Sequence, residues 1–205
     1  MRTAIVRALR IVAVATALLP AAGPLHAAPD LERATQLVEK RCSVCHGMQG
    51  ESSGEFFPRL GGQHAEYIAK QLRDFKEGRR KGEMTRFARN LSEEVIEGLG
   101  LYFSRQKVAP HPPAEPELGA VGRYLYHNGN RFSGVPACKD CHGASGEGAP
   151  RLPRLAGQRS LYLERQLKDF NQRERTNDND IMHAVASKLT EFELKALAEY
   201  ISGMQ

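Results

Sequence analysis

Two short cysteine motifs hold the residues of this 205-residue chain whose types and spacing most directly suggest chemistry. The segment from Cys42 to His46 has the pattern Cys-x-x-Cys-His, and the same pattern recurs from Cys138 to His142. On one helical turn, side chains three and four positions apart share a face. Both sulfurs can then form thioethers to a porphyrin edge while the histidine binds iron, the attachment signature of c-type haem. The sequence predicts two covalent haem c groups, attached through Cys42, Cys45, Cys138 and Cys141.

The two motifs belong to an internal repeat of about 80 residues. Pro58 to Gln63 returns as Pro153 to Gln158, and further matches follow in the same order at offsets of 95 to 98. Between the copies, residues 108–116 hold four prolines in nine positions, which favours an extended spacer. We therefore expect an N-terminal domain at residues 28–110 and a C-terminal domain at residues 111–205.

The first 27 residues predict a cleaved signal peptide. Arg2, Arg7 and Arg10 form a positive segment, residues 11–19 are apolar, and Pro20 follows. Nine apolar residues cannot cross about 30 Å of hydrocarbon, so no transmembrane segment is expected in the mature protein. Without this leader the chain carries 26 basic and 24 acidic side chains, which removes the charge argument for nucleic-acid binding. We expect an exported, periplasmic protein.

Four cysteines in an exported protein also allow a two-disulfide interpretation, with three possible pairings. A zinc site made from two such pairs usually has them about 15–20 residues apart, whereas Cys45 and Cys138 lie 93 positions apart. A thioredoxin-like dithiol requires a strand–helix–strand context that this chain lacks. All three alternatives leave His46 and His142 unexplained.

The hydrophobic pattern predicts an all-α fold. Residues with helical spacing mark one helix in each repeat, and these are Ala65, Ile68, Leu72 and Phe75, then Leu163, Leu167 and Phe170. A final helix in each repeat begins at Ser92 or at Thr190, the latter with Glu193 in a capping box. The apolar stripes of the final helices are Ile96, Leu99 and Phe103, and Leu194, Leu197 and Ile201. A further helix is predicted over residues 31–40, and no strand-like alternation is present.

The sixth iron ligands are predicted to be methionines. Met84 and Met182 occupy equivalent positions, 38 and 40 residues after the motif histidines, in what we expect to be polar loops. Methionine opposite histidine raises the reduction potential and suits electron transfer better than oxygen chemistry. The alternative is that these methionines fill gaps in the core. None of the four remaining histidines of the mature chain has a histidine at the equivalent position of the other repeat, and all four are expected on the surface or in loops. They are His64, His111, His127 and His183.

Two pairs of residues are predicted to support the haem sites. The carbonyls of Pro58 and Pro153 are placed to accept the Nδ1–H of the motif histidines and so to orient the rings. Arg59 and Arg154 can pair with haem propionates, because a guanidinium group suits a carboxylate. The alternative for both arginines is a solvated loop charge.

These motifs resemble those of the dihaem cytochrome c4 family over nearly the whole mature chain. The resemblance implies two tandem cytochrome c domains, with His46, Met84, His142 and Met182 as axial ligands. It also implies a periplasmic electron carrier, not an enzyme, that connects a quinol-oxidising cytochrome complex to a terminal oxidase in a membrane. The segment from Pro150 to Pro153 departs from the family pattern by an extra proline-bounded turn.

Two other functions are compatible with two haem motifs. The chain can be the dihaem cytochrome subunit of a periplasmic dehydrogenase, such as a sulfide-oxidising flavocytochrome, and would then be a permanent interface partner. A haem peroxidase would require an open iron site, against which the two methionines argue.

Overall fold

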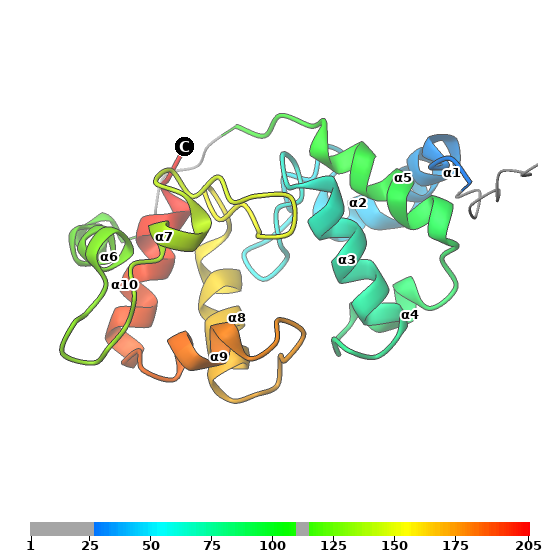
Figure 1. The fold of residues 1–205 in the computed structure, drawn as a ribbon. Helices are drawn as coiled ribbons and strands as arrows, with labels where there is room; N and C mark the ends of the chain where they lie inside the picture. The colour runs from blue at the N-terminus through cyan, green and yellow to red at the C-terminus, as the bar shows by residue number, and fades with distance from the viewer. Residues whose placement is uncertain (1–26, 110–114) are drawn as a thin grey trace, which may run out of the picture.

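The computed structural model describes residues 27–109 and 115–205, which form two helical units side by side (Figure 1). The predicted signal peptide at residues 1–26 and the centre of the proline-rich spacer, residues 110–114, lie outside the described residues. Within the described ranges, extended pairing is limited to isolated bridges between Asn130 and Val135 and between Ala149 and Leu152. The all-α prediction is confirmed. The second bridge closes the proline-bounded turn between Ala149 and Pro153.

The N-terminal unit contains two long helices and the C-terminal unit three, and the other helices of both units are short. The N-terminal unit consists of α1 (Leu31–Leu37), the π-helical η1 (Val38–Cys42), α2 (Ser43–His46), α3 (Ala65–Lys76), α4 (Met84–Ala88) and α5 (Glu93–Ser104). The C-terminal unit consists of α6 (Pro116–Asn128), α7 (Lys139–His142), α8 (Ser160–Asn171), α9 (Ile181–Ala186) and α10 (Glu191–Ser202). Helix α5 packs against α1 and α3, and α10 packs against α6 and α8 in the corresponding way.

The two units have separate hydrophobic cores. In the N-terminal unit, Ile96 and Phe103 of α5 meet Ile68 and Phe75 of α3. In the C-terminal unit the buried stripe of α10 meets α6 and α8, and its members are Leu194, Leu197 and Ile201. The predicted stripes of both final helices are therefore confirmed, because a helix that buries one face needs apolar residues at this spacing.

Both predicted caps hold the starts of the final helices. Ser92 accepts a hydrogen bond from the backbone N–H of Val95 through its side chain. Thr190 accepts from the N–H of Glu193, and the Glu193 carboxylate accepts from the N–H of Thr190. This reciprocal arrangement satisfies two amides that a helix start would otherwise leave unpaired.

The helices that precede the cysteine motifs differ from the sequence prediction. The predicted helix over residues 31–40 is α-helical only as far as Leu37, and the chain then continues as the π-helical η1. Helix α6 was not predicted, and His127 lies in its last turn instead of in a loop. Gly122 weakens the helix signal of this segment because glycine has a low helix propensity. A Cβ at this position would collide with the carbonyl oxygen of Ala196. Glycine is therefore required where α6 crosses α10 closely.

The two units are joined by a reciprocal pair of contacts between the repeated proline–arginine segments. The N–H of Arg59 donates to Gln158 Oε1 (2.7 Å), and Gln158 Nε2 donates to the Arg59 carbonyl (3.0 Å). Arg154 and Gln63 make the same exchange at 2.8 and 2.9 Å. Both glutamines are buried. The repeat therefore places each glutamine where it satisfies backbone groups of the other unit.

We expect Ile96→Ala and Leu194→Ala, at equivalent positions of α5 and α10, each to destabilise the protein by about 3 kcal/mol. Both side chains are almost wholly buried, at 0% and 1% exposure, so truncation leaves a cavity in one core. Chemical unfolding of the holoprotein, followed by circular dichroism, measures the change. Phe132→Ala is the control, because Phe132 is 87% exposed and surface changes usually stay within about 0.5 kcal/mol. Equal losses in the control and in the core variants would contradict this account of the cores.

Candidate haem-binding site

The two cysteine motifs end in short helices of the same shape. Helix α2 ends at His46 and α7 ends at His142, and each is followed by a glycine with positive φ, Gly47 at 76° and Gly143 at 84°. A Cβ at either glycine would also collide with the carboxyl group of a nearby glutamate. Glycine thus ends each helix directly after the histidine and turns the chain away from the ring.

Both motif histidines are buried and oriented by a proline carbonyl. His46 Nδ1 lies 3.1 Å from the Pro58 oxygen, and His142 Nδ1 lies 3.3 Å from the Pro153 oxygen. Burial lowers the pKa of both imidazoles, although the carbonyl contact opposes this shift. A neutral ring must then carry its proton on Nδ1, because a carbonyl can only accept. Nε2 is left with a lone pair suited to a metal ion. The predicted role of both proline carbonyls is confirmed.

The four cysteines, all within the described residues, form no disulfide. Burial raises the pKa of Cys42, with Arg41 acting against it, and burial raises the pKa of Cys138 to about 11. Free thiols, unlike disulfides, can add to a porphyrin edge. Their chemistry fits neutral thioether links to a porphyrin.

A single large cavity connects the two motifs. Its volume is about 1530 Å³, and it is lined by both motif histidines, by Met84 and by Met182. Apolar side chains from α3 and α8 form much of its wall, among them Leu72, Phe75, Leu163 and Phe170. A site for one small ligand usually measures about 300–1,000 Å³. This cavity therefore has room for two large planar groups, one beside each motif.

Met84 and Met182 lie at equivalent places in the two units, but not in loops as expected. Met84 is the first residue of α4, and Met182 is the second residue of α9. Both side chains are half-buried and both line the cavity. The sequence concealed these helices because they are only five and six residues long and have no side-chain cap.

Comparison with known proteins gives concordant matches over most of the chain. A family model described as cytochrome c matches residues 31–94 and 122–205. Cytochrome c4 of Pseudomonas aeruginosa is 40% identical over 187 residues, which cover 89% of this chain and 92% of that protein. The chain belongs to the cytochrome c4 family. The crystal structure of reduced recombinant cytochrome c4 from Pseudomonas stutzeri has the same fold, with a TM-score of 0.80 and 37% identity over 87% of this chain and 100% of that one.

A more distant relative bears a different name. The thiosulfate dehydrogenase electron acceptor of Thiomonas intermedia is 34% identical over 201 residues, covering 94% of this chain and 90% of that protein. As a member of the cytochrome c4 family, the chain is a dihaem electron carrier with two covalently bound haem c groups, and not an enzyme. Within the described residues, no helix is long and apolar enough to cross a bilayer.

The other described histidines of this cytochrome c4 have structural partners away from the motifs. His64 Nε2 lies 2.8 Å from the Glu147 carbonyl in the other unit, and His183 Nδ1 lies 3.0 Å from the Phe170 carbonyl. His127 Nε2 lies 2.9 Å from the hydroxyl of Tyr200. None of the three lines the cavity. His111 lies outside the described residues.

Arg59 is not a solvated loop charge. It is buried, and its guanidinium group donates to the carbonyls of Gly157 and Ala109, so that it ties the two units together. Arg154 lines the cavity and bonds across the interface through its backbone. Arg59 also lines the cavity, so the propionate role of both arginines stays a prediction.

The sequence interpretation missed a second pair of repeated arginines, Arg80 and Arg175, whose spacing of 95 was the available signal. Both are buried at the cavity wall. Both guanidinium groups donate to the side-chain oxygens of Gln71 and Gln166, and each donates to a tyrosine hydroxyl of the other unit. Among the described residues, neither arginine has an acidic partner. Buried cations require counter-charges, and two haem propionates fit that requirement.

We expect the mature protein, produced with a haem-maturation system, to show the mass of the polypeptide plus two haems under denaturing conditions. Replacing Cys42 and Cys45 together by serine should leave one haem, and the Cys138/Cys141 pair should behave likewise, because each motif attaches its own group. Intact-mass spectrometry measures both results. Replacement of Ser43, which lies inside the first motif, by alanine is the control and should retain two haems. A mass without haem in the unmodified protein would refute covalent attachment.

Proposed function

We propose that His46 with Met84, and His142 with Met182, are the axial iron ligands of this cytochrome c4. Cys42 and Cys45 would carry one thioether-linked haem, and Cys138 and Cys141 the other. One observation carries the proposal: both histidines and both methionines line the same apolar-walled cavity. The repeat equivalence of the two sets supports the assignment independently of the cavity.

The bound haem iron supplies a one-electron redox couple. The protein's part is to keep each imidazole fixed through its proline carbonyl and to surround the site with apolar side chains that exclude water. A methionine and a histidine bound to one haem iron would favour its reduced state and would leave no open position for oxygen chemistry. The arrangement therefore supports electron transfer rather than peroxide turnover.

The interface between the units supports internal electron exchange. The reciprocal contacts of Arg59 with Gln158 and of Gln63 with Arg154 hold both halves of the cavity together. Two redox groups held in one chain exchange electrons at a rate that does not depend on protein concentration. We propose domains at residues 28–110 and 111–205, and export to the periplasm after removal of residues 1–27.

The partners we propose are a quinol-oxidising cytochrome complex as electron donor and a terminal oxidase as acceptor. The surfaces around the two motifs differ in a way that suits two partners. Val44 is 73% exposed and Phe56 61% exposed beside the first motif, whereas the position equivalent to Val44 holds Asp140. Near-neutral charge in both units implies that such local patches, more than net charge, select the partner.

A second function is favoured by one specific finding. A relative that covers 94% of this chain is named a thiosulfate dehydrogenase electron acceptor. The alternative is therefore that this cytochrome c4 accepts electrons from a periplasmic dehydrogenase, for example a sulfide-oxidising flavocytochrome, as a bound subunit. Co-purification of the native protein with a dehydrogenase, instead of with respiratory complexes, would favour this alternative.

Met84→Ala and Met182→Ala are each expected to remove half of the near-infrared band that arises from methionine sulfur bound to ferric haem. The reason is that each methionine would ligate one of two irons. Absorption spectroscopy of the oxidised protein measures the band. Met48→Ala is the matched control, because Met48 is 44% exposed and should leave the band intact. A full band in either ligand variant would remove that residue from the ligand set.

Met84→His and Met182→His are expected to impair different half-reactions, because electrons enter through one unit and leave through the other. Histidine in place of methionine should lower the potential of the altered site. Stopped-flow reduction by the donor complex and oxidation by the terminal oxidase give the two rates. Met48→His controls for an added surface histidine. Identical defects in both half-reactions for both ligand variants would show that the units are interchangeable.

A further inference from the structure

The loop that leads to Met182 is longer than its counterpart. Arg80 and Arg175 are offset by 95 residues, but Met84 and Met182 are offset by 98. Three extra residues therefore lie between the buried arginine and the methionine in the C-terminal unit. Both ends of the loop remain equivalent in the two units, so the additional length must be accommodated outside the repeated core.

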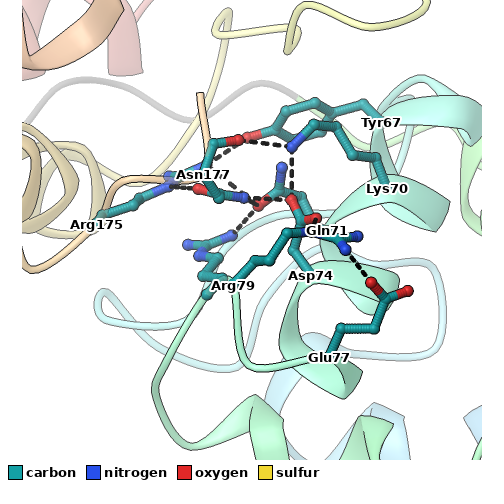
Figure 2. Close-up of polar contacts among 9 residues, drawn as sticks. Tyr67, Lys70, Gln71, Asp74, Glu77, Arg79, Arg175 and Asn177 are labelled. Atoms are coloured by element: carbon teal, nitrogen blue, oxygen red, sulfur yellow. Dashed lines mark hydrogen bonds and ion pairs between the residues drawn. The ribbon is translucent and has the colours of Figure 1, made fainter. Parts of the chain in front are cut away.

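The longer loop contacts the N-terminal unit through Asn177 (Figure 2). Asn177 Nδ2 donates to Asp74 Oδ2 at 2.6 Å and to Gln71 Oε1 at 3.0 Å. The Asn177 carbonyl accepts from Lys70 Nζ at 2.7 Å. Arg175 Nε donates to Asn177 Oδ1 at 3.1 Å, which fixes the orientation of the amide. One residue of the loop is thus held by three residues of α3.

Asp74 is the centre of this contact. Only 2% of the residue is exposed, and its carboxylate also accepts from Lys70 Nζ at 2.5 Å and from Arg79 Nε at 2.8 Å. Burial alone would raise the pKa of Asp74, but the hydrogen bonds from Lys70, Asn177 and Arg79 outweigh it and lower the pKa. The carboxylate is therefore charged, and Asn177 supplies one of the three side-chain hydrogen bonds that it accepts.

The short segment between Asn177 and Met182 has a defined conformation. Asp178 Oδ2 accepts from the backbone N–H of Met182 at 2.6 Å. Asn179 and Asp180 have φ values of 58° and 63°, in the left-handed region that asparagine and aspartate enter more readily than other non-glycine residues. A displacement of Asn177 would therefore be transmitted to the start of α9, where Met182 lies.

The N-terminal unit has no equivalent contact among the described residues. Asp169 corresponds to Asp74, but it accepts from Gln166 Nε2 of its own unit at 3.0 Å. The positions equivalent to Lys70 and Arg79 hold Arg165 and Glu174. The shorter loop before Met84 bonds within its own unit, where Thr85 N donates to the Gly82 carbonyl.

We propose that Asp74 and Asn177 form a cross-unit latch, through which the N-terminal unit positions Met182 in the C-terminal unit. Asp74 is then a positioning residue that acts on a ligand of the other unit. The position of Met182 depends on the N-terminal unit, whereas the position of Met84 does not depend on the C-terminal unit. The proposal rests on the proposed role of Met182 as an iron ligand. It predicts that the iron–sulfur bond at Met182 is sensitive to the interface, whereas the bond at Met84 is not.

The test is the rate at which imidazole displaces methionine from the ferric holoprotein. Met84→Ala and Met182→Ala identify which kinetic phase belongs to which unit. Asn177→Asp is nearly isosteric and places a second carboxylate against Asp74. It should accelerate the Met182 phase about tenfold or more, since a charge-assisted hydrogen bond is replaced by repulsion, and leave the Met84 phase unchanged. The exchanged pair Asp74→Asn with Asn177→Asp restores a donor opposite a carboxylate and should recover most of the wild-type rate.

Asp169→Asn is the matched control and should alter neither phase. Hydrogen exchange of residues 176–183 gives a second readout, expected to be faster in Asn177→Asp and normal in the exchanged pair. Lys70→Ala, at a residue with 38% side-chain exposure, gives a milder variant with the same expected direction. An unchanged Met182 phase in Asn177→Asp, or equal acceleration of both phases, would overturn the latch. A Met182→Ala protein with a full near-infrared band would instead refute the ligand assignment, while hydrogen exchange still tests the loop contact.

Discussion

The orientation of a buried imidazole by a proline carbonyl is the interaction on which the rest of each unit depends. A neutral histidine that is removed from water must find an acceptor for one ring nitrogen, and this leaves the other nitrogen directed to a metal ion. The helix that carries His46 must therefore end at once, at Gly47, so that the chain can return to Pro58 and bring its carbonyl to the Nδ1 edge of the ring. The same histidines line a large cavity with apolar walls, and small units of this kind usually need a staple such as a covalently bound group.

Duplication of this unit creates a second constraint, because two matched surfaces are buried against each other and their backbone polar groups need partners. Gln63 and Gln158 supply these partners, since each bonds to the backbone of the opposite repeat. The two equivalent glutamines therefore make equivalent contacts, with pseudo-two-fold symmetry. Arg80 and Arg175 bring positive charge to the same interface with only neutral protein partners. The interface is thus both a structural joint and the site of two buried positive charges. The latch at Asp74 breaks the symmetry, since only one of the two loops is long enough to cross.

Most of the chemistry could be predicted from sequence because it depends on local spacing. The Cys-x-x-Cys-His motifs fix three side chains on one turn, and the caps at Ser92 and Thr190 act within four residues. Helix α6 and the short α4 and α9 escaped prediction because long-range contacts stabilise them. Gly122 has poor helix propensity, yet it permits the close approach of α10, and Met84 begins a helix of only five residues. The two carbonyl partners of Arg59 were missed for the same reason, since they lie 50 and 98 residues away.

The sequence by itself determined the cofactor class, the duplication, the all-α fold and the pairing of each histidine with a proline carbonyl. Each of these follows from residue types and their spacing along the chain. Both can be recognised without knowing which distant residues become neighbours. Only the tertiary structure decided how the two units meet, which arginines line the cavity and which loop crosses the interface. Those features depend on groups far apart in the chain that become neighbours when two cores pack side by side. Asp74 and Asn177 are 103 residues apart, so no local pattern shows that Asp74 bonds across the interface. The roles of Asp74 and Asp169 differ because the loop before Met182 has three additional residues. These bring Asn177 to the buried interface, where its amide needs an acceptor and Asp74 provides one.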